Sequence, residues 1–156
     1  MKYMQSALEE ARRAFEADEV PVGALVVKEG VILSRTHNLM EALRDPTAHA
    51  EVLAIREAAG KLGNWRLEGA TLYVTKEPCP MCAGAIVNAR VSRVVYGCRD
   101  GKGGAADSLY HILTDKRLNH QAEVVSGLLS EESAGLLKEF FRNRRTGPGI
   151  MVSKSV

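Results

Sequence analysis

The residues best suited to chemistry lie in two short stretches, a His-x-Glu ending at Glu51 and a Pro-Cys-x-x-Cys ending at Cys82. His49, Cys79 and Cys82 are of the ligand types that zinc prefers, and a site with three protein ligands keeps a fourth position for water. Bound zinc makes such a water acidic enough to act as hydroxide near neutral pH. Glu51 is close to that water without being a ligand, so it could carry the proton. The two stretches together predict a zinc site with hydrolytic chemistry.

The spacing places each ligand near the start of a helix. Cys79 and Cys82 are three residues apart, so on a helix they lie on one face, about one turn apart. Pro80 suits the first turn, where its missing N–H costs nothing, and the positive end of the helix dipole favours a thiolate there. Thr47 is expected to cap a second helix that carries His49. The two residues of the His-x-Glu motif are two positions apart and do not share a helical face, which suits one ligand and one proton carrier.

A Cys-x-x-Cys pair by itself also fits a redox dithiol or a structural zinc site. A structural site normally has four protein ligands, and this chain supplies a fourth only if Cys98 or another histidine joins. Cys98 follows the apolar run at residues 94–97 and is interpreted as a small residue at the end of a strand. Because both motifs occur in this order, each at an expected helix start, we favour the catalytic interpretation.

Composition sets the wider limits. The chain has 156 residues, 46% of them hydrophobic, which fits a single domain with an adequate core. Three cysteines, two of them assigned to a metal, leave no disulfide framework, so we expect a reducing, cytoplasmic location. The first residues lack the apolar run of a signal peptide, and no apolar stretch is long enough to span a membrane. The net charge is only +2, so an argument for nucleic acid has to come from local clusters.

Hydrophobic spacing predicts alternating helices and strands. A first helix is expected where apolar residues recur at helical spacing from Met4 to Phe15. Strands are expected at 20–27, 31–35, 70–75, 91–96 and 122–126, helices at 48–62, 80–88 and 131–144, and a glycine-rich loop at 100–106. This order predicts an α/β sheet covered by helices. The chain should form one domain over residues 1–145, followed by a flexible tail over residues 146–156.

Longer matches identify a family. The chain resembles the bacterial tRNA-specific adenosine deaminases (the TadA family), and the resemblance runs from about Tyr3 to Arg145. The zinc motifs alone are shared by all cytidine deaminase-like nucleobase deaminases. Matching segments include Glu-Val-Pro-Val-Gly-Ala at 19–24 and Asp-Pro-Thr-Ala-His-Ala-Glu at 45–51. The more specific signals are Gly-Cys-Arg-Asp-Gly-Lys at 97–102 and Glu-Phe-Phe-Arg at 139–142. The resemblance implies a mixed five-stranded sheet sandwiched by helices, a homodimer, and hydrolysis of the wobble adenosine of a tRNA anticodon to inosine.

The resemblance also implies roles for single residues. His49, Cys79 and Cys82 would hold one Zn²⁺ per subunit, and Glu51 would be the proton shuttle. The residues that would bind the tRNA anticodon stem-loop are Asn38 at the edge of the flipped base, Val22 against its face, Asp100 and Lys102 at a neighbouring ribose or phosphate, and Phe141 and Arg145 on the last helix.

Residue type alone offers an alternative for several of these substrate-binding roles. Asn38 could simply form a turn after a strand, and Asp100 could cap its own loop. Phe141 could be ordinary core, and Arg145 could lie on a solvated face. In favour of a phosphate-binding role, the last helix does carry a local basic cluster made of Lys138, Arg142, Arg144 and Arg145.

Two positions depart from the pattern expected of this family. Lys76 stands where an apolar residue, commonly Leu, usually precedes Glu-Pro-Cys, and Met40 occupies a position that is sometimes basic. Both departures bear on fine specificity, since they leave the ligands untouched. Two other functions stay open: deamination of a free base or nucleotide of the guanine or cytosine type, and a zinc-stabilised RNA-binding module without catalysis. Glu51 argues against the last, because a structural zinc site needs no carboxylate beside it.

Overall fold

Helices and strands alternate along the chain, and the computed structural model describes residues 1–146. In chain order the elements are α1 (Lys2–Glu16), β1 (Gly23–Lys28), β2 (Val31–His37), α2 (Met40–Leu43), α3 (Ala50–Leu62), β3 (Thr71–Lys76), α4 (Pro80–Asn88), β4 (Arg93–Cys98), the 3-10 helix η1 (Ile112–Thr114), β5 (Glu123–Ser126) and α5 (Ser130–Thr146). Thr146 was expected to begin the flexible tail, but it is the last residue of α5. The rest of that predicted tail, 147–156, lies outside the described residues.

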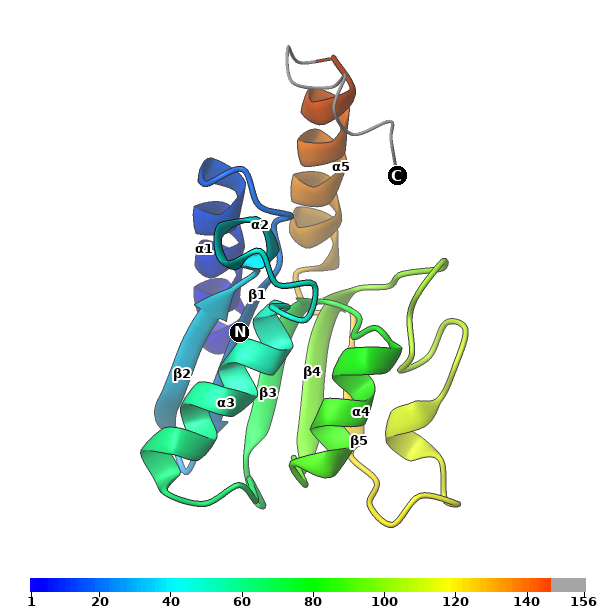
Figure 1. The fold of residues 1–156 in the computed structure, drawn as a ribbon. Coiled ribbons are helices and arrows are strands. Elements are labelled where there is room, and N and C mark those ends of the chain that lie inside the picture. The colour runs from blue at the N-terminus through cyan, green and yellow to red at the C-terminus, as the bar shows by residue number, and fades with distance from the viewer. Residues whose placement is uncertain (147–156) are drawn as a thin grey trace.

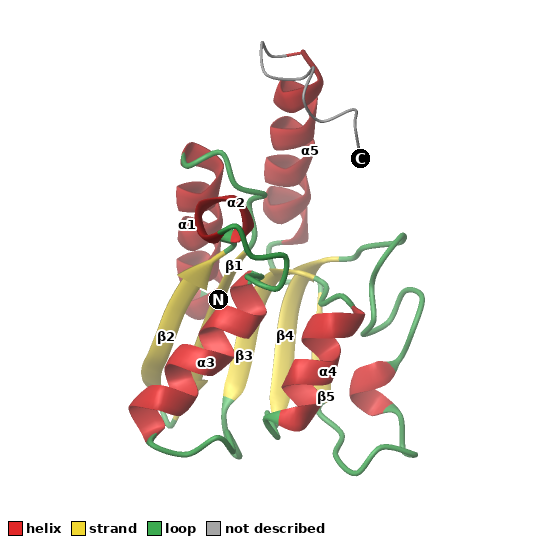
Figure 2. Cartoon of the chain, viewed as in Figure 1, coloured by secondary structure: helices red, strands yellow, loops and turns green. Residues whose placement is uncertain are grey.

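The five strands form one mixed sheet, as the family resemblance implied, in the order β2-β1-β3-β4-β5. Strand β1 runs antiparallel to both β2 and β3, whereas β3, β4 and β5 are parallel to one another. Four of the five strands therefore point the same way, and the carboxyl ends of β2, β3 and β4 share one edge of the sheet (Figure 2). In open α/β sheets ligands bind at such an edge.

Helices cover both faces of the sheet, which confirms the predicted sandwich. Helices α3 and α4 lie on one face, while α1 and α5 lie on the other (Figure 1). The two cores divide β1 between them: Ala24 and Val26 pack in the core of α3 and α4, whereas Leu25 and Val27 pack with residues of α1. A strand covered on both faces reads as a continuous apolar run, which is how residues 24–27 appear in the sequence.

Two short elements were not predicted, α2 and η1. Helix α2 has four residues and no side-chain cap from its own N-cap position. Instead, the buried carboxylate of Glu19 accepts hydrogen bonds from the amides of Glu41 and Ala42, at 3.0 and 2.7 Å. Because this cap comes from 22 and 23 residues away, local sequence gives no sign of it. None of the described helices is both long and apolar enough to cross a membrane.

Candidate functional site

Both metal-binding motifs stand at helix starts, as the spacing predicted. His49 is the N-cap residue of α3, and Cys79 is the N-cap residue of α4, with Pro80 as the first helical residue. The expectation that Thr47 caps α3 is wrong. Its amide and hydroxyl both donate to the carboxylate of Asp45, at 2.8 and 2.7 Å, in the turn before the helix. The polypeptide thus presents the positive ends of two helices at the site.

The three predicted ligands lie together, although the histidine is 30 and 33 residues from the cysteines. The Nδ1 atom of His49 lies 3.6 Å from the Sγ atom of Cys79 and 3.3 Å from the Sγ atom of Cys82. All three ligand atoms are within 4.8 Å of one another. Tetrahedral zinc with ordinary bond lengths would hold a nitrogen and a sulfur about 3.5 Å apart. The group could therefore hold a metal ion without rearrangement.

The cluster already favours one thiolate. The hydrogen bond with the Cys82 thiol, assisted by the His49 ring, lowers the pKa of Cys79 to about 4 against the effect of burial. The same bond and burial raise the pKa of Cys82. Thiolate is the form in which cysteine binds metals, and a coordinated thiol loses its proton outright. A bound cation would thus convert the Cys82 thiol to a thiolate, the form that the cluster already favours for Cys79.

Glu51 follows His49 by two residues and reaches the same cavity. It belongs to the first turn of α3 and is only 4% exposed, yet it lines the same cavity as His49 and Cys79. Burial raises the pKa of its carboxyl. A carboxyl that holds its proton more readily than usual, beside a candidate metal site, is suited to taking up and returning protons.

The cavity in front of this group measures about 240 Å³ and lies at the shared carboxyl edge of β2, β3 and β4. It is lined by Val20, Val22, Asn38, Met40, His49, Ala50, Glu51, Lys76, Glu77, Cys79, Asp100 and Phe141. Drug-sized ligands occupy pockets of about 300–1,000 Å³, so this cavity suits a single ring system. Cys82 is buried and does not line it.

Four of the six predicted substrate-binding residues line this cavity: Val22, Asn38, Asp100 and Phe141. The other two, Lys102 and Arg145, are exposed and lie outside its lining. Phe141 is 42% exposed, so it is not the core residue that its type suggested, although its ring contacts that of Phe140. It belongs to α5, a helix that projects beyond the edge of the sheet (Figure 1).

Asn38 forms the turn that its type suggested and also lines the cavity. Its Oδ1 atom accepts a hydrogen bond from the amide of Met40 at 3.3 Å, which is the turn expected after a strand. Its Nδ2 atom lies 3.4 Å from the carbonyl oxygen of Val20. The residue is 5% exposed and still lines the cavity. The turn therefore fixes the amide in place and does not exclude a role in binding.

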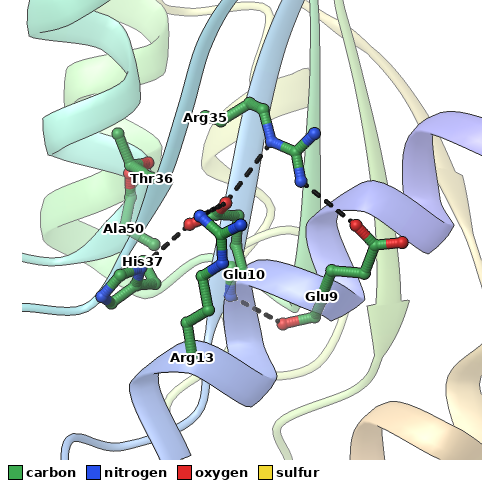
Figure 3. Close-up of polar contacts among 9 residues, drawn as sticks. Glu9, Glu10, Arg13, Arg35, Thr36, His37 and Ala50 are labelled. Atoms are coloured by element: carbon green, nitrogen blue, oxygen red, sulfur yellow. Dashed lines mark hydrogen bonds and ion pairs between the residues drawn. The ribbon is translucent and has the colours of Figure 1, made fainter. Parts of the chain in front are cut away.

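A charged network that the sequence did not reveal anchors the end of β2 ahead of Asn38 (Figure 3). The buried carboxylate of Glu10 on α1 binds the ring of His37 at 2.9 Å and the guanidinium groups of Arg13 and Arg35 at 3.3 and 3.4 Å. On the other face, the hydroxyl of Thr36 donates to the carbonyl oxygen of Ala50 in the first turn of α3, at 2.7 Å. These bonds connect α1, β2 and α3 next to the site.

A second buried carboxylate, that of Glu77, holds the loop after β4. It accepts hydrogen bonds from the amides of Asp100, Ala106, Asp107 and Ser108 and from the Ser108 hydroxyl. Although burial opposes it, bonding to Ser108 and the amides lowers the pKa of Glu77 to about 2. A Cβ atom at Gly104 would lie 2.3 Å from this carboxyl, which explains a glycine there. Sequence reasoning missed Glu77, since its partners lie 23 to 31 residues away.

The loop carboxylate Asp100 is held from two sides. Its Oδ1 atom accepts bonds from the amides of Lys102 and Gly103 at 3.0 and 3.2 Å, as expected of a loop-capping aspartate. Its Oδ2 atom lies 3.2 Å from the ammonium of Lys76. Burial works against ionisation here, but the Lys102 amide and Lys76 together lower the pKa of Asp100. Lys76, which departs from the residue type expected in this family, thus forms part of the cavity wall.

The sequence and the fold both resemble those of known deaminases. The model of the family described as "MafB19-like deaminase" matches residues 1–145. The tRNA-specific adenosine deaminase of Bacillus subtilis (strain 168) is 57% identical over 143 residues, which are 92% of this chain and 89% of that protein. A structure from studies of A-to-I editing by tRNA:A34 deaminases at the wobble position superposes with a TM-score of 0.84 at 48% identity, covering 87% of this chain and 99% of the other. Guanine deaminase from Nitrosomonas europaea superposes with a TM-score of 0.77 at 26% identity, covering 88% and 82%.

Proposed function

The chain belongs to the family of tRNA-specific adenosine deaminases, and we propose that it converts the wobble adenosine of a tRNA anticodon to inosine. The reaction consumes water and releases ammonia. The observation that carries the proposal is the placement of His49, Cys79 and Cys82 around one point, with the buried Glu51 in the wall of the same small cavity. A base flipped out of an anticodon loop is a ligand of the size and chemistry that this cavity suits.

We propose that His49, Cys79 and Cys82 hold one Zn²⁺ ion in each subunit. When bound at such a site, zinc makes a water molecule acidic enough to serve as the nucleophile near neutral pH. Glu51 would take a proton from that water and return it to the base, so that the amino group leaves as ammonia. The raised pKa of its carboxyl supports both halves of this transfer.

The remaining cavity residues would position the nucleotide. Asn38 offers a donor and an acceptor for the edge of the base, and Val22 would pack against its face. Asp100 could accept a bond from the ribose 2′-hydroxyl, the group that distinguishes RNA from DNA. Outside the cavity, Lys102 and Arg145 are exposed cations that suit phosphates of the anticodon loop. Phe141, at the rim, offers an aromatic face on which a neighbouring base could stack.

We also propose that two copies of the chain form a homodimer. Exposed apolar side chains on α4 and on the segment after β4 support this proposal, because a second copy that covered them would remove apolar surface from water. They include Met81, Leu109 and Tyr110, which are 37%, 50% and 54% exposed. Light scattering during size-exclusion chromatography would give the mass in solution, to be compared with the 17.0 kDa of one chain.

The test of the proposed reaction uses an RNA anticodon stem-loop with adenosine at the wobble position. Zinc-loaded protein should convert that adenosine to inosine, as seen by nucleoside analysis, and leave adenosines at other loop positions largely unchanged. The same protein should be offered free guanine, cytosine and adenosine in parallel. Faster release of ammonia from a free base than from the stem-loop would favour the free-base alternative, which the similarity to guanine deaminase supports.

A further inference from the structure

Lys76 is unusual among the residues that line the cavity, because of its charge. The lining contains three carboxylates, those of Glu51, Glu77 and Asp100. Among the described lining residues, Lys76 is the one that carries a permanent positive charge. The substrate of the proposed function is a polyanion, and an acidic cavity would repel its backbone. The ammonium of Lys76 therefore supplies a positive charge among carboxylates that would otherwise repel the RNA backbone.

The position of Lys76 is fixed by the fold at both ends of its side chain. Its backbone is the last residue of β3, paired with Cys98 of β4, so it cannot move away from the sheet edge. Its Nζ atom lies 3.2 Å from the Oδ2 atom of Asp100, whose other oxygen is held by two loop amides. The Lys76 side chain remains 31% exposed. An ammonium has three donors, so one bond to Asp100 leaves capacity for an incoming ligand.

We propose that Lys76 is a specificity-determining residue that binds a phosphodiester flanking the flipped adenosine. This inference rests on the proposed function and adds a substrate contact to it. Asp100 holds the ammonium at the rim of the cavity, and the RNA backbone then completes its coordination. A free base or nucleoside has no such phosphate. The contact would therefore favour adenosine within a polynucleotide over the same base free in solution.

The experiment compares Lys76→Met, which keeps the length of the side chain and removes its charge, with Lys76→Arg, which keeps the charge. On the anticodon stem-loop, Lys76→Met should lower kcat/KM about 10-fold at low salt, mainly through KM. Its plot of log kcat/KM against log salt concentration should be shallower by about one phosphate contact. Lys76→Arg should stay close to the parent. Lys61→Met, at the far end of α3, is the matched control and should change neither quantity.

Chemical changes in the RNA locate the contact. Two stem-loops are made, one with an uncharged methylphosphonate on the 5′ side of the wobble adenosine and one with it on the 3′ side. On one of these two RNAs, the parent and Lys76→Met should have the same kcat/KM. If both modified loops keep the difference, or if Lys76→Met behaves like the parent on the ordinary loop, the proposal is wrong. Zinc content and melting temperature show that each variant is folded.

Two further outcomes distinguish a direct phosphate contact from an indirect effect through Asp100 and from failure of the proposed function. Lys76→Met could act only by leaving Asp100 unpaired, so the same change is made in an Asp100→Asn background. Asparagine keeps an oxygen that can hold the ammonium. If Asp100→Asn alone keeps the salt dependence of the parent and Lys76→Met then has no effect, Lys76 works through Asp100 and the direct phosphate contact is wrong; a persisting loss supports the contact. Failure of the proposed function looks different, since the parent protein itself would form no inosine in the stem-loop.

Discussion

Two buried glutamates near the cavity, Glu51 and Glu77, show how one side chain is put to opposite uses. They are 4% and 2% exposed. Glu77 is surrounded by donors of the loop after β4, and its pKa falls to about 2. Glu51 stands beside a histidine and two cysteines, and burial raises its pKa. The many hydrogen-bond donors around Glu77 keep its carboxylate ionised and bound to the loop. Glu51 has fewer donors around it, so its carboxyl can take up and release a proton.

The other two buried glutamates resemble Glu77. Glu10 is bound by two arginines and a histidine, and Glu19 caps α2 through two backbone amides. Each of these carboxylates connects elements that are distant in the chain. Burial by itself therefore does not single out the residue that does chemistry; the identity of its neighbours does.

The largest expected effect is loss of turnover in Glu51→Gln. The amide keeps the size of the side chain but cannot carry a proton, and general acid–base catalysis contributes about 10²- to 10⁴-fold. We expect kcat on the anticodon stem-loop to fall at least this far, while zinc content and melting temperature stay near those of the parent. A variant that kept most of its activity would show that another group moves the proton.

Cys79→Ser should remove the metal and part of the stability together. Because a metal bound only by the folded chain contributes its binding free energy to folding, losing a ligand weakens both. We expect a lower zinc content and a lower melting temperature, measured by elemental analysis and thermal unfolding. Adding excess zinc should recover some of the melting temperature in the parent treated with chelator, but much less in the variant. Full zinc occupancy in Cys79→Ser would contradict the proposed ligand set.

Glu77→Gln should act on stability, in contrast to Glu51→Gln. The amide loses the charge-assisted bonds and turns one acceptor into a donor that faces other donors, at a cost of about 3 kcal/mol in the free energy of unfolding. Urea unfolding of both variants measures the difference. Zinc content should persist, and any loss of activity should appear in KM, because the displaced loop carries Asp100. Equal stability of the two variants would remove the distinction between these carboxylates.

Unfolding at low pH tests whether the negative charge of Glu77 is the source of this stability. The pKa of Glu77 is about 2 in the folded chain, below its ordinary value of 4.5. A depressed pKa contributes stability above the unfolded value and loses it as the pH falls through the folded value. The gap in stability between the parent and Glu77→Gln should therefore be constant above pH 4.5 and close progressively toward pH 2. A gap that did not depend on pH would mean that the charge of Glu77 is unimportant.

The sequence predicted the site better than it predicted the supports of the site. The candidate ligands and Glu51 lie within two short motifs, and the strands follow from apolar runs. The structure accordingly brings these residues together and contains five strands. The partners of Glu77 and Glu10 are fixed only by tertiary contacts between distant segments, for which one sequence offers no local signal. The error at Thr47 has a similar cause. A threonine before a helix has the right type for a cap, but Asp45 competes for its hydroxyl and His49 occupies the cap position.

The smallest expected effect is that of Cys98→Ala. Cys98 ends β4, and its carbonyl oxygen accepts the amide of Glu77 at 2.8 Å. Its thiol is buried, and burial raises its pKa, so it should stay neutral. Alanine removes the sulfur and keeps the carbonyl, at a cost of about 1 kcal/mol. Zinc content and kcat should match the parent. Loss of the metal would instead make Cys98 a fourth protein ligand and close the site to water. In that case Glu51 would have no nucleophile to deprotonate.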